Sequence, residues 1–174
     1  SAEPVVESTS FGIAFEPVEP SSASEPTSKA AALPKYGSPE WQTYVMSQFQ
    51  PNELMDGFPR CFGLRRVAQD LLGPIISSGP KMVSVVPQMT ANEISSRAVT
   101  VLYEITFDWN FDACIWFNPN SPPVSNHKTF GAVSDCVEDI NTAWGRNPAA
   151  SADTKAESRA LKKALCINVL SAEE

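Results

Sequence analysis

The feature that most constrains the fold is a long alternation of apolar and polar residues from Arg97 to Phe111. From Val99 onward every second residue is apolar, and most of the residues between them are polar. Because successive side chains of a β-strand point to opposite faces, this period of two predicts one strand with a buried face and a solvated face. Such strands are typical of antiparallel sheets that are covered on one side only.

Shorter strands are expected around this one. The apolar runs at 81–86 and 114–117 predict two of them, and 129–133 is expected to return as a third. The segment 118–126 is rich in Pro, Asn and Ser and therefore predicts a loop. Residues 134–150 are expected to form an irregular link to the last helix.

A basic amphipathic helix is predicted at 151–170. At about 100° per residue its cations fall within roughly a third of the circumference, and the other side carries mostly small apolar side chains. The cations of this stripe are Lys155, Arg159, Lys162 and Lys163. The pattern indicates a helix that packs closely on a sheet and keeps a basic exposed edge.

Two further helices are predicted before the strands. Ser38, followed by a proline, is suited to cap a short helix that ends before Pro51. A second helix spans about 62–72, presents one apolar face and stops at Gly73. Because strands separate these helices from the basic one, the chain is predicted to be α+β, an antiparallel sheet flanked by helices.

The N-terminal residues 1–34 differ in composition from the rest of the chain. They are rich in Ser, Pro, Ala and Glu, with one small apolar island at Phe11, Ile13 and Phe15. Such a segment buries too little apolar surface to offset its chain entropy, so we expect a flexible acidic arm and a single domain at 35–174. The island is either part of a loose tail or a docking segment for a partner.

Charge is unevenly distributed along the chain. The formal net charge of -7 weighs against an anionic partner, but residues 1–56 alone hold eight acids and two lysines. In contrast, 57–97 and 146–163 each hold five bases and two acids, which gives each a net charge of +3. Two locally basic segments are therefore compatible with an anionic partner despite the net charge.

Catalytic and metal chemistry find little support in the sequence. His127 is the single histidine and is expected in a loop, with no cluster of metal-ligand spacing around it. The Gly-rich motif that cradles nucleotide phosphates is absent from the sequence. Asp135, Glu138 and Asp139 are interpreted as solvated acids in the link. We therefore expect a protein that is not an enzyme and that needs no cofactor or metal.

The four cysteines are far apart and form no CxxC pair. This spacing is typical of reduced thiols inside a cell, in the cytoplasm, the nucleoid or the nucleus. The sequence holds no apolar run of about 18 residues, so no membrane span is expected. The start of the chain lacks a basic region followed by an apolar block, which argues against a secretory signal.

Anion binding is the chemistry that the residues leave open. Basic residues on two helices, with aromatic residues between them in the sequence, are what a groove for single-stranded nucleic acid requires. The same bases also fit solvated helix faces, and the aromatic residues Trp109, Phe111, Trp116 and Phe117 are more typical of a core. From the residues alone, both interpretations remain possible.

Three stretches, taken together, resemble the annealing domain of the Rad-fifty-two superfamily of single-strand annealing recombination proteins, which includes phage recombinases of the RecT, Erf and lambda Red beta kind. The first is GLRRVAQDLLG at 63–73, which resembles the helix of that family with an Arg-Val pair. The second is the alternating strand at 97–107, and the third is DTKAESRALKKAL at 153–165. The similarity covers about residues 60–170.

The resemblance implies a β-β-β-α core that assembles into rings or helical filaments, with single-stranded DNA in a basic groove. It implies that Lys162 and Lys163 hold the DNA backbone together with Arg66, and that Arg65 is the second choice on the earlier helix. Helical geometry alone adds Lys155 and Arg159 to this set. The expected function is the annealing of complementary strands in homologous recombination and DNA repair, without nucleotide hydrolysis.

The expected partners are single-stranded DNA, further copies of the chain, and a single-strand-binding protein or an exonuclease. A rival interpretation is a structural module that self-associates through its arm and sheet edges, with the basic stripes serving acids of neighbouring subunits. A small hydrolase is a third interpretation, for which the residues supply no visible catalytic site.

Overall fold

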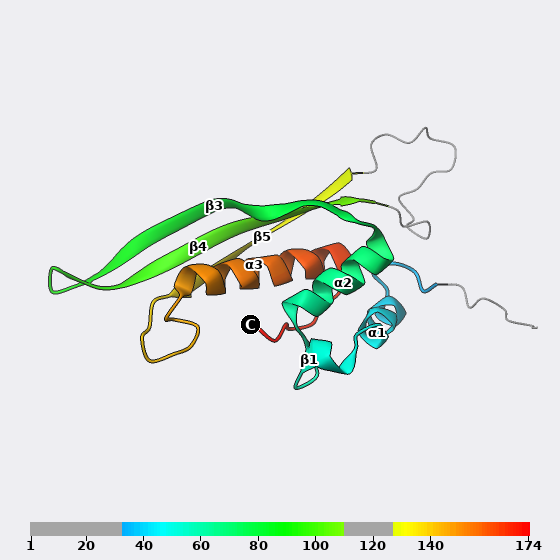
Figure 1. Cartoon of the computed structure of the whole chain (residues 1–174), viewed down its shortest axis with the longest axis horizontal. Coiled ribbons are helices and arrows are strands. Elements are labelled where there is room, and N and C mark those ends of the chain that lie inside the picture. The colour runs from blue at the N-terminus through cyan, green and yellow to red at the C-terminus, as the bar shows by residue number, and fades with distance from the viewer. Residues whose placement is uncertain (1–32, 110–126) are drawn as a thin grey trace, which may run out of the picture. The chain divides into compact units, whose positions relative to one another are not determined.

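The computed structural model describes residues 33–109 and 127–174. Within them, an antiparallel three-stranded sheet is covered by helices on one face (Figure 1). The predicted fold class, α+β with an antiparallel sheet flanked by helices, is therefore confirmed. The arm predicted at 1–34, apart from its last two residues, and the strand and loop predicted at 114–117 and 118–126 lie outside the described residues.

Among the described residues, the sheet has the strand order β3-β4-β5, so β3 and β5 are its two edges there. Its strands are β3 at Ile75–Thr90, β4 at Glu93–Asp108 and β5 at His127–Val137. In register, Tyr103 of β4 pairs with Pro80 of β3 and with Ala132 of β5. The alternate residues of β4 from Val99 to Phe107 are at most 5% exposed, which confirms the predicted buried face.

Two strand predictions were too short. β3 begins at Ile75 and not at 81, and it includes Gly79 and Pro80, two residue types that usually interrupt a strand. A register shift after Pro80 accommodates them in the pairing with β4. β5 begins at His127, which was predicted to lie in a loop, and includes 134–137, which were assigned to the link. Pairing with the long β4, rather than a strong alternation of its own, fixes these residues as a strand.

The helices agree with the predictions in number and approximate position. They are α1 at Pro39–Ser47, α2 at Cys61–Leu72 and α3 at Pro148–Leu165. A short 3-10 helix at Pro51–Glu53 and a small hairpin of β1 (Leu54–Met55) and β2 (Phe58–Pro59) connect α1 to α2.

Both boundaries of α3 differ from the predicted helix at 151–170. The side chain of Asn147 accepts a hydrogen bond from the backbone of Ala150 and so caps an earlier start at Pro148. At the other end Cys166 adopts a left-handed conformation with a φ of 53°, which stops the helix after Leu165.

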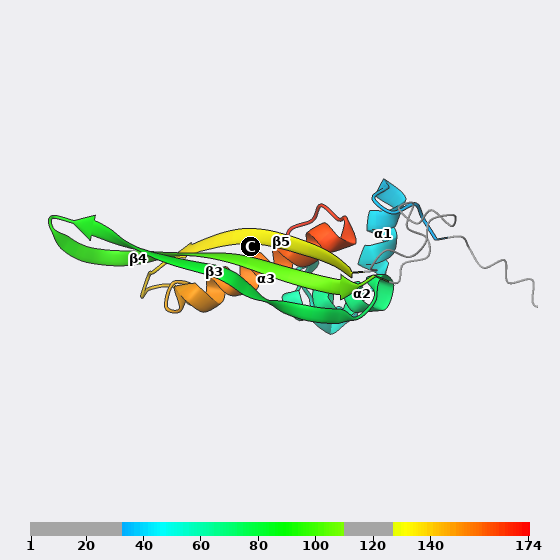
Figure 2. The same cartoon turned by 90° about the horizontal axis from the view of Figure 1, so that it is seen from above.

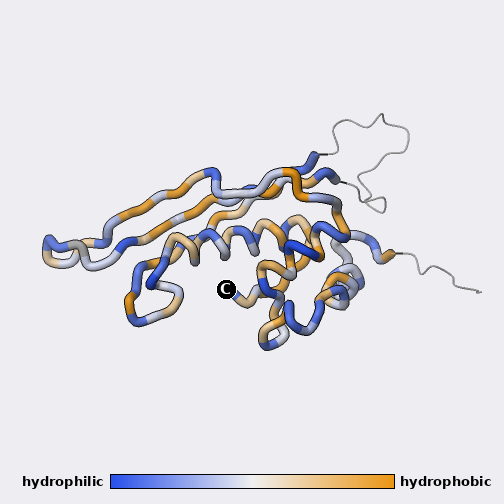
Figure 3. The backbone as a smooth tube through the Cα atoms, viewed as in Figure 1, coloured by the Kyte–Doolittle hydropathy of each residue, from blue (hydrophilic) through white to orange (hydrophobic). Residues whose placement is uncertain are grey.

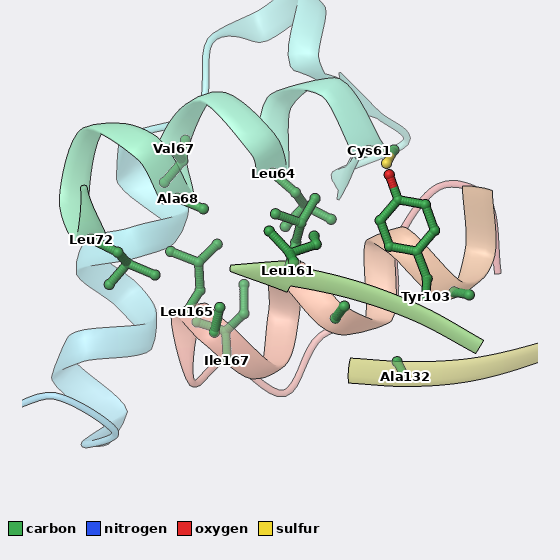
Figure 4. Close-up of a cluster of buried hydrophobic side chains, with 14 of the residues drawn as sticks. Cys61, Leu64, Val67, Ala68, Leu72, Tyr103, Ala132, Leu161, Leu165 and Ile167 are labelled. Atoms are coloured by element: carbon green, nitrogen blue, oxygen red, sulfur yellow. The ribbon is translucent and has the colours of Figure 1, made fainter. Parts of the chain in front are cut away.

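The core lies between the sheet and the helices. α3 packs mainly on β4 and β5 and also contacts α2. Every fourth residue of α3 from Ala152 to Ala164 is a fully buried alanine, and these small side chains let the helix lie close to the sheet. Figure 4 shows leucine and valine side chains of α2 facing Leu161 and Leu165 of α3.

Two side chains near α1 attach it to the end of α3. The indole Nε1 of Trp41 donates to the carbonyl of Leu165 at 2.6 Å, and the Tyr36 hydroxyl donates to the carbonyl of Ala164 at 2.6 Å. The last carbonyl groups of a helix have no partner within the helix, so these bonds satisfy them. They hold the start of α1 beside the end of α3.

The outer part of the β3–β4 hairpin extends beyond the helices (Figure 2). Apolar side chains of β3 are more than half exposed here on both faces of the strand, and Figure 3 shows the hydrophobic residues along this part. We call this surface the β3 apolar edge: Met82, Val83, Val85, Val86 and Met89.

Candidate nucleic-acid interface

Three of the predicted DNA-binding residues line one groove. It lies between the start of α1 and the end of α3, has a volume of about 930 Å³ and contains Arg159, Lys162 and Lys163. We call it the basic groove. Polar residues on its walls are Ser38, Gln42, Thr43 and Asn168.

The walls of the basic groove are fixed by hydrogen bonds between side chains in or just before α1 and the backbone at the end of α3. In addition to the bonds from Tyr36 and Trp41, the Gln42 side chain accepts a hydrogen bond from the Asn168 backbone at 2.9 Å. The groove is therefore part of the folded core and not a gap between independent elements.

Lys163 is the most accessible cation of the basic groove. Its side chain is exposed, and Nζ donates one hydrogen bond to the carbonyl of Gly131 in β5 at 2.8 Å. Within residues 33–109 and 127–174, it forms no ion pair. Because an ammonium group has three donors, Lys163 can bind an outside anion while keeping this contact.

Arg159 has two partners in the structure. Its Nε donates to the carboxylate of Glu174 at 2.9 Å, and its Nη1 donates to the carbonyl of Val133 in β5 at 3.0 Å. The side chain remains 41% exposed. A guanidinium group has five donors, so part of its hydrogen-bonding capacity is still directed to solvent.

Lys162 does not lie on an exposed edge, contrary to the sequence prediction. The residue is only 8% exposed, and its Nζ forms an ion pair with Glu174. The physical reason is that the chain turns back after α3 and places Glu174 against it. The predicted role of Lys162 in DNA binding stays a prediction, and it requires Glu174 to move.

Arg66 is held by acceptors on three residues, one of which lies on its own helix. It forms two hydrogen bonds with Glu53, at 2.5 and 2.6 Å, one with Asp70 at 2.7 Å and one with the carbonyl of Gln48 at 2.8 Å. The hydrogen bonds from Arg66 lower the pKa of Glu53, although burial opposes this shift. These contacts give Arg66 a structural role, and its predicted DNA contact stays a prediction.

Arg65 joins α2 to α3 and to the sheet. Its Nε donates to Glu157 at 2.8 Å, and its Nη2 donates to the Ser78 hydroxyl at 2.9 Å. The side chain borders a separate pocket of about 510 Å³ that also contains Phe62 and Trp144. The structure thus does not place Arg65 among the residues that line the basic groove.

Lys155 lies on α3 about one turn before Arg159 and is half-buried. It forms no ion pair with the part of the chain that the structure describes. Lys155 could therefore extend the positive charge of the basic groove along α3, as helical geometry predicts.

Sequence reasoning missed the neutral and acidic residues of this site. Gln42 and Asn168 are 126 residues apart and meet only because α1 packs on the end of α3. Glu174 carries no local signal of its role, because an acid near a lysine in the sequence is usually solvated. The proline after Ser38 did locate the start of α1, which forms one wall.

The described residues also bear on three other features, namely a nucleophilic thiol, a metal site and a membrane span. Burial raises the pKa of the Cys61 thiol to about 12, so this thiol is not a nucleophile at neutral pH. Within residues 33–109 and 127–174, no group of three or more His, Cys, Asp or Glu residues could hold a metal ion. The helices of the same residues include none that is long and apolar enough to cross a membrane.

Comparison with known proteins adds no family to this description. The chain matches no family model, no curated protein and no solved structure.

Proposed function

We propose that this chain binds single-stranded DNA in the basic groove and promotes annealing of complementary strands as a homo-oligomer, without nucleotide hydrolysis. The observation that supports the proposal is that Arg159, Lys162 and Lys163, predicted from the sequence as phosphate contacts, line one groove with polar neutral walls. The resemblance to single-strand annealing proteins favours this function over other uses of a basic groove.

The mechanism is electrostatic capture of the DNA backbone. Cations that contact phosphates release the counterions of the strand, which favours binding at low salt. The neutral side chains of Gln42, Thr43 and Asn168 can donate or accept hydrogen bonds without fixing a base identity. Base edges that stay free can then pair with a second strand held nearby by another copy of the chain.

The test is a salt titration of binding to a labelled oligothymidylate, followed by fluorescence anisotropy. The double variant Lys162→Ala/Lys163→Ala removes two phosphate contacts, so the salt slope is expected to fall by about 1.4 and the affinity by about tenfold or more. The same variant should also slow the annealing of two complementary strands in the absence of nucleotide.

The matched control is Lys81→Ala/Arg146→Ala, which makes the same change of net charge at exposed residues outside the basic groove. It is expected to change the affinity by less than about threefold, because distant exposed charges are screened by salt. Equal binding by the two double variants, both folded by circular dichroism, would show that the groove is not the DNA site.

A second candidate function is supported by the β3 apolar edge. β3 is an edge strand, and large apolar side chains on both of its faces are more than half exposed. An exposed apolar edge is a template for pairing with another chain, and a second copy supplies a strand of matching kind. In this alternative the chain is an assembly module, and the cations of α3 have a structural role only.

A further inference from the structure

The last four residues described, Ser171–Glu174, turn back along α3 toward the small hairpin of β1 and β2 (Figure 1). The backbone of Ala172 donates to the carbonyl of Pro59 at 3.0 Å, and Ser171 is only 3% exposed. We call these residues the acidic segment, since two of the four are glutamates.

Glu173 takes the position of an anion at the start of α2. Its Oε1 accepts a hydrogen bond from the Cys61 backbone at 2.8 Å, and its Oε2 accepts one from the Ser158 hydroxyl at 3.3 Å. The side chain of Arg60, at the cap position, makes no capping bond to α2. Because the first N–H groups of a helix lack partners and favour negative charge, the Glu173 carboxylate stabilises the start of α2.

Glu174 takes the position of an anion against two cations of the basic groove, although it does not itself line the groove. Its carboxylate pairs with Lys162 and with Arg159, and its Oε2 also accepts hydrogen bonds from the backbone and hydroxyl of Ser171, at 3.0 and 3.2 Å. Burial opposes ionisation of this carboxyl, but hydrogen bonds from Lys162 and Arg159 lower its pKa to about 2. Glu174 is therefore ionised at neutral pH and neutralises cations that a phosphate would otherwise contact.

We propose that the acidic segment competes with nucleic-acid phosphate for Lys162 and Arg159, so that single-stranded DNA must displace Glu174 to bind fully. The proposal rests on the proposed function of the basic groove. Lys163, which has no acidic partner among the described residues, makes the first contact. Release of Glu174 then exposes two more cations to the strand.

Two properties of the segment suit it to such a role. Its contacts with the groove are ionic and use the same donors that bind a phosphate oxygen, so one anion replaces another without unpaired donors. Glu174 also lies outside the described helices and strands, so its displacement breaks none of them and can leave the Glu173 contact with α2 in place. The apparent affinity for DNA is then reduced by the fraction of molecules in which the segment is released.

The test compares the variant Glu174→Gln with wild type in oligothymidylate binding over a range of salt. If the segment is released in about a fifth of the wild-type molecules, the variant binds about fivefold more tightly. Its salt slope becomes steeper by about 0.7 for each additional phosphate that the protein neutralises. The matched control Glu93→Gln removes one acid at the exposed start of β4 and is expected to leave the salt slope unchanged.

If Glu174→Gln binds oligothymidylate no more tightly than Glu93→Gln does, the competition is overturned. If neither variant nor the wild type binds oligothymidylate, the proposed function is overturned as well.

A second measurement uses the wild-type chain, so that a folding defect of the variant does not decide the result. Addition of oligothymidylate is expected to speed amide hydrogen exchange in the acidic segment. Unchanged or slower exchange there would show that DNA binding leaves the segment in place and would also overturn the proposal.

Discussion

At one edge of the sheet, charged side chains of α3 cover β5, whereas at the other edge β3 exposes valine and methionine side chains. Lys163 donates to the carbonyl of Gly131, and Arg159 donates to the carbonyl of Val133. The backbone of β3 accepts only one hydrogen bond from a side chain in the described part of the chain. The donor is the Ser95 hydroxyl of β4, and the acceptor is the carbonyl of Gln88 near the turn.

The difference shows that the cations of α3 have a structural role as well as the proposed role toward DNA. Charged side chains that satisfy edge carbonyls discourage the addition of another strand, so β5 is protected where α3 lies beside it. β3 extends beyond the helices and lacks this protection. We therefore expect a second copy of the chain to cover β3 rather than β5.

The largest expected effect comes from charging the β3 apolar edge. Val83 and Val85 are 54% and 53% exposed, and burial of two such side chains in an interface stabilises it by about 3 kcal/mol. The variant Val83→Lys/Val85→Lys should therefore raise the concentration for half-association about 100-fold. Sedimentation velocity over a range of protein concentrations measures this shift.

The matched control places the same charges on the opposite edge. Val133 and Val137 of β5 are each 50% exposed, so Val133→Lys/Val137→Lys changes equally accessible residues. We expect less than about a threefold change for this control, because surface substitutions outside an interface have small effects. An equal loss of association from both variants would remove the contrast between the edges.

A smaller effect on self-association is expected when the side-chain donors that cover the edge of β5 are removed. The variant Arg159→Met/Lys163→Met keeps the apolar stems but removes the donors to Gly131 and Val133. Two edge carbonyls then become available to another strand, at about 1 kcal/mol for each new hydrogen bond. The two bonds together contribute about 2 kcal/mol, so association should strengthen about 30-fold, as measured by light scattering.

Lys155→Met is the matched control for this prediction, because Lys155 lies on the same helix and bonds no carbonyl of β5 within residues 33–109 and 127–174. It should leave association unchanged. If Arg159→Met/Lys163→Met associates no more strongly than the wild type does, the bonds from α3 to β5 do not protect the β5 edge.

Features with a local signal could be predicted from the sequence. The alternation in β4 and the alanines of α3 reflect contacts that repeat with the period of each element, so they predicted the fold class. The start of β3 at Ile75 could not be predicted, because pairing with β4 overrides the turn preference of Gly79 and Pro80 within the strand.

The environment of the basic residues was less accessible to prediction than their positions. Three cations of the predicted stripe on α3 line one groove, and their predicted role in DNA binding stays a prediction. The burial of Lys162 and the contacts of Arg66 depend on Glu174 and Glu53, which lie 12 and 13 residues away and beyond the ends of the respective helices. Only the folded chain brings these acids against the bases.

The most direct test of the central claim is to locate bound DNA by ultraviolet crosslinking of an oligothymidylate that carries 4-thiothymidine, followed by mass spectrometry of the peptides. Cys166 is exposed on the wall of the basic groove and offers a reactive side chain there. DNA bound in the basic groove is expected to crosslink to peptides from the start of α1 and the end of α3, around Gln42 and Cys166. Crosslinks confined to the β3–β4 hairpin, with none in these two segments, would contradict the claim.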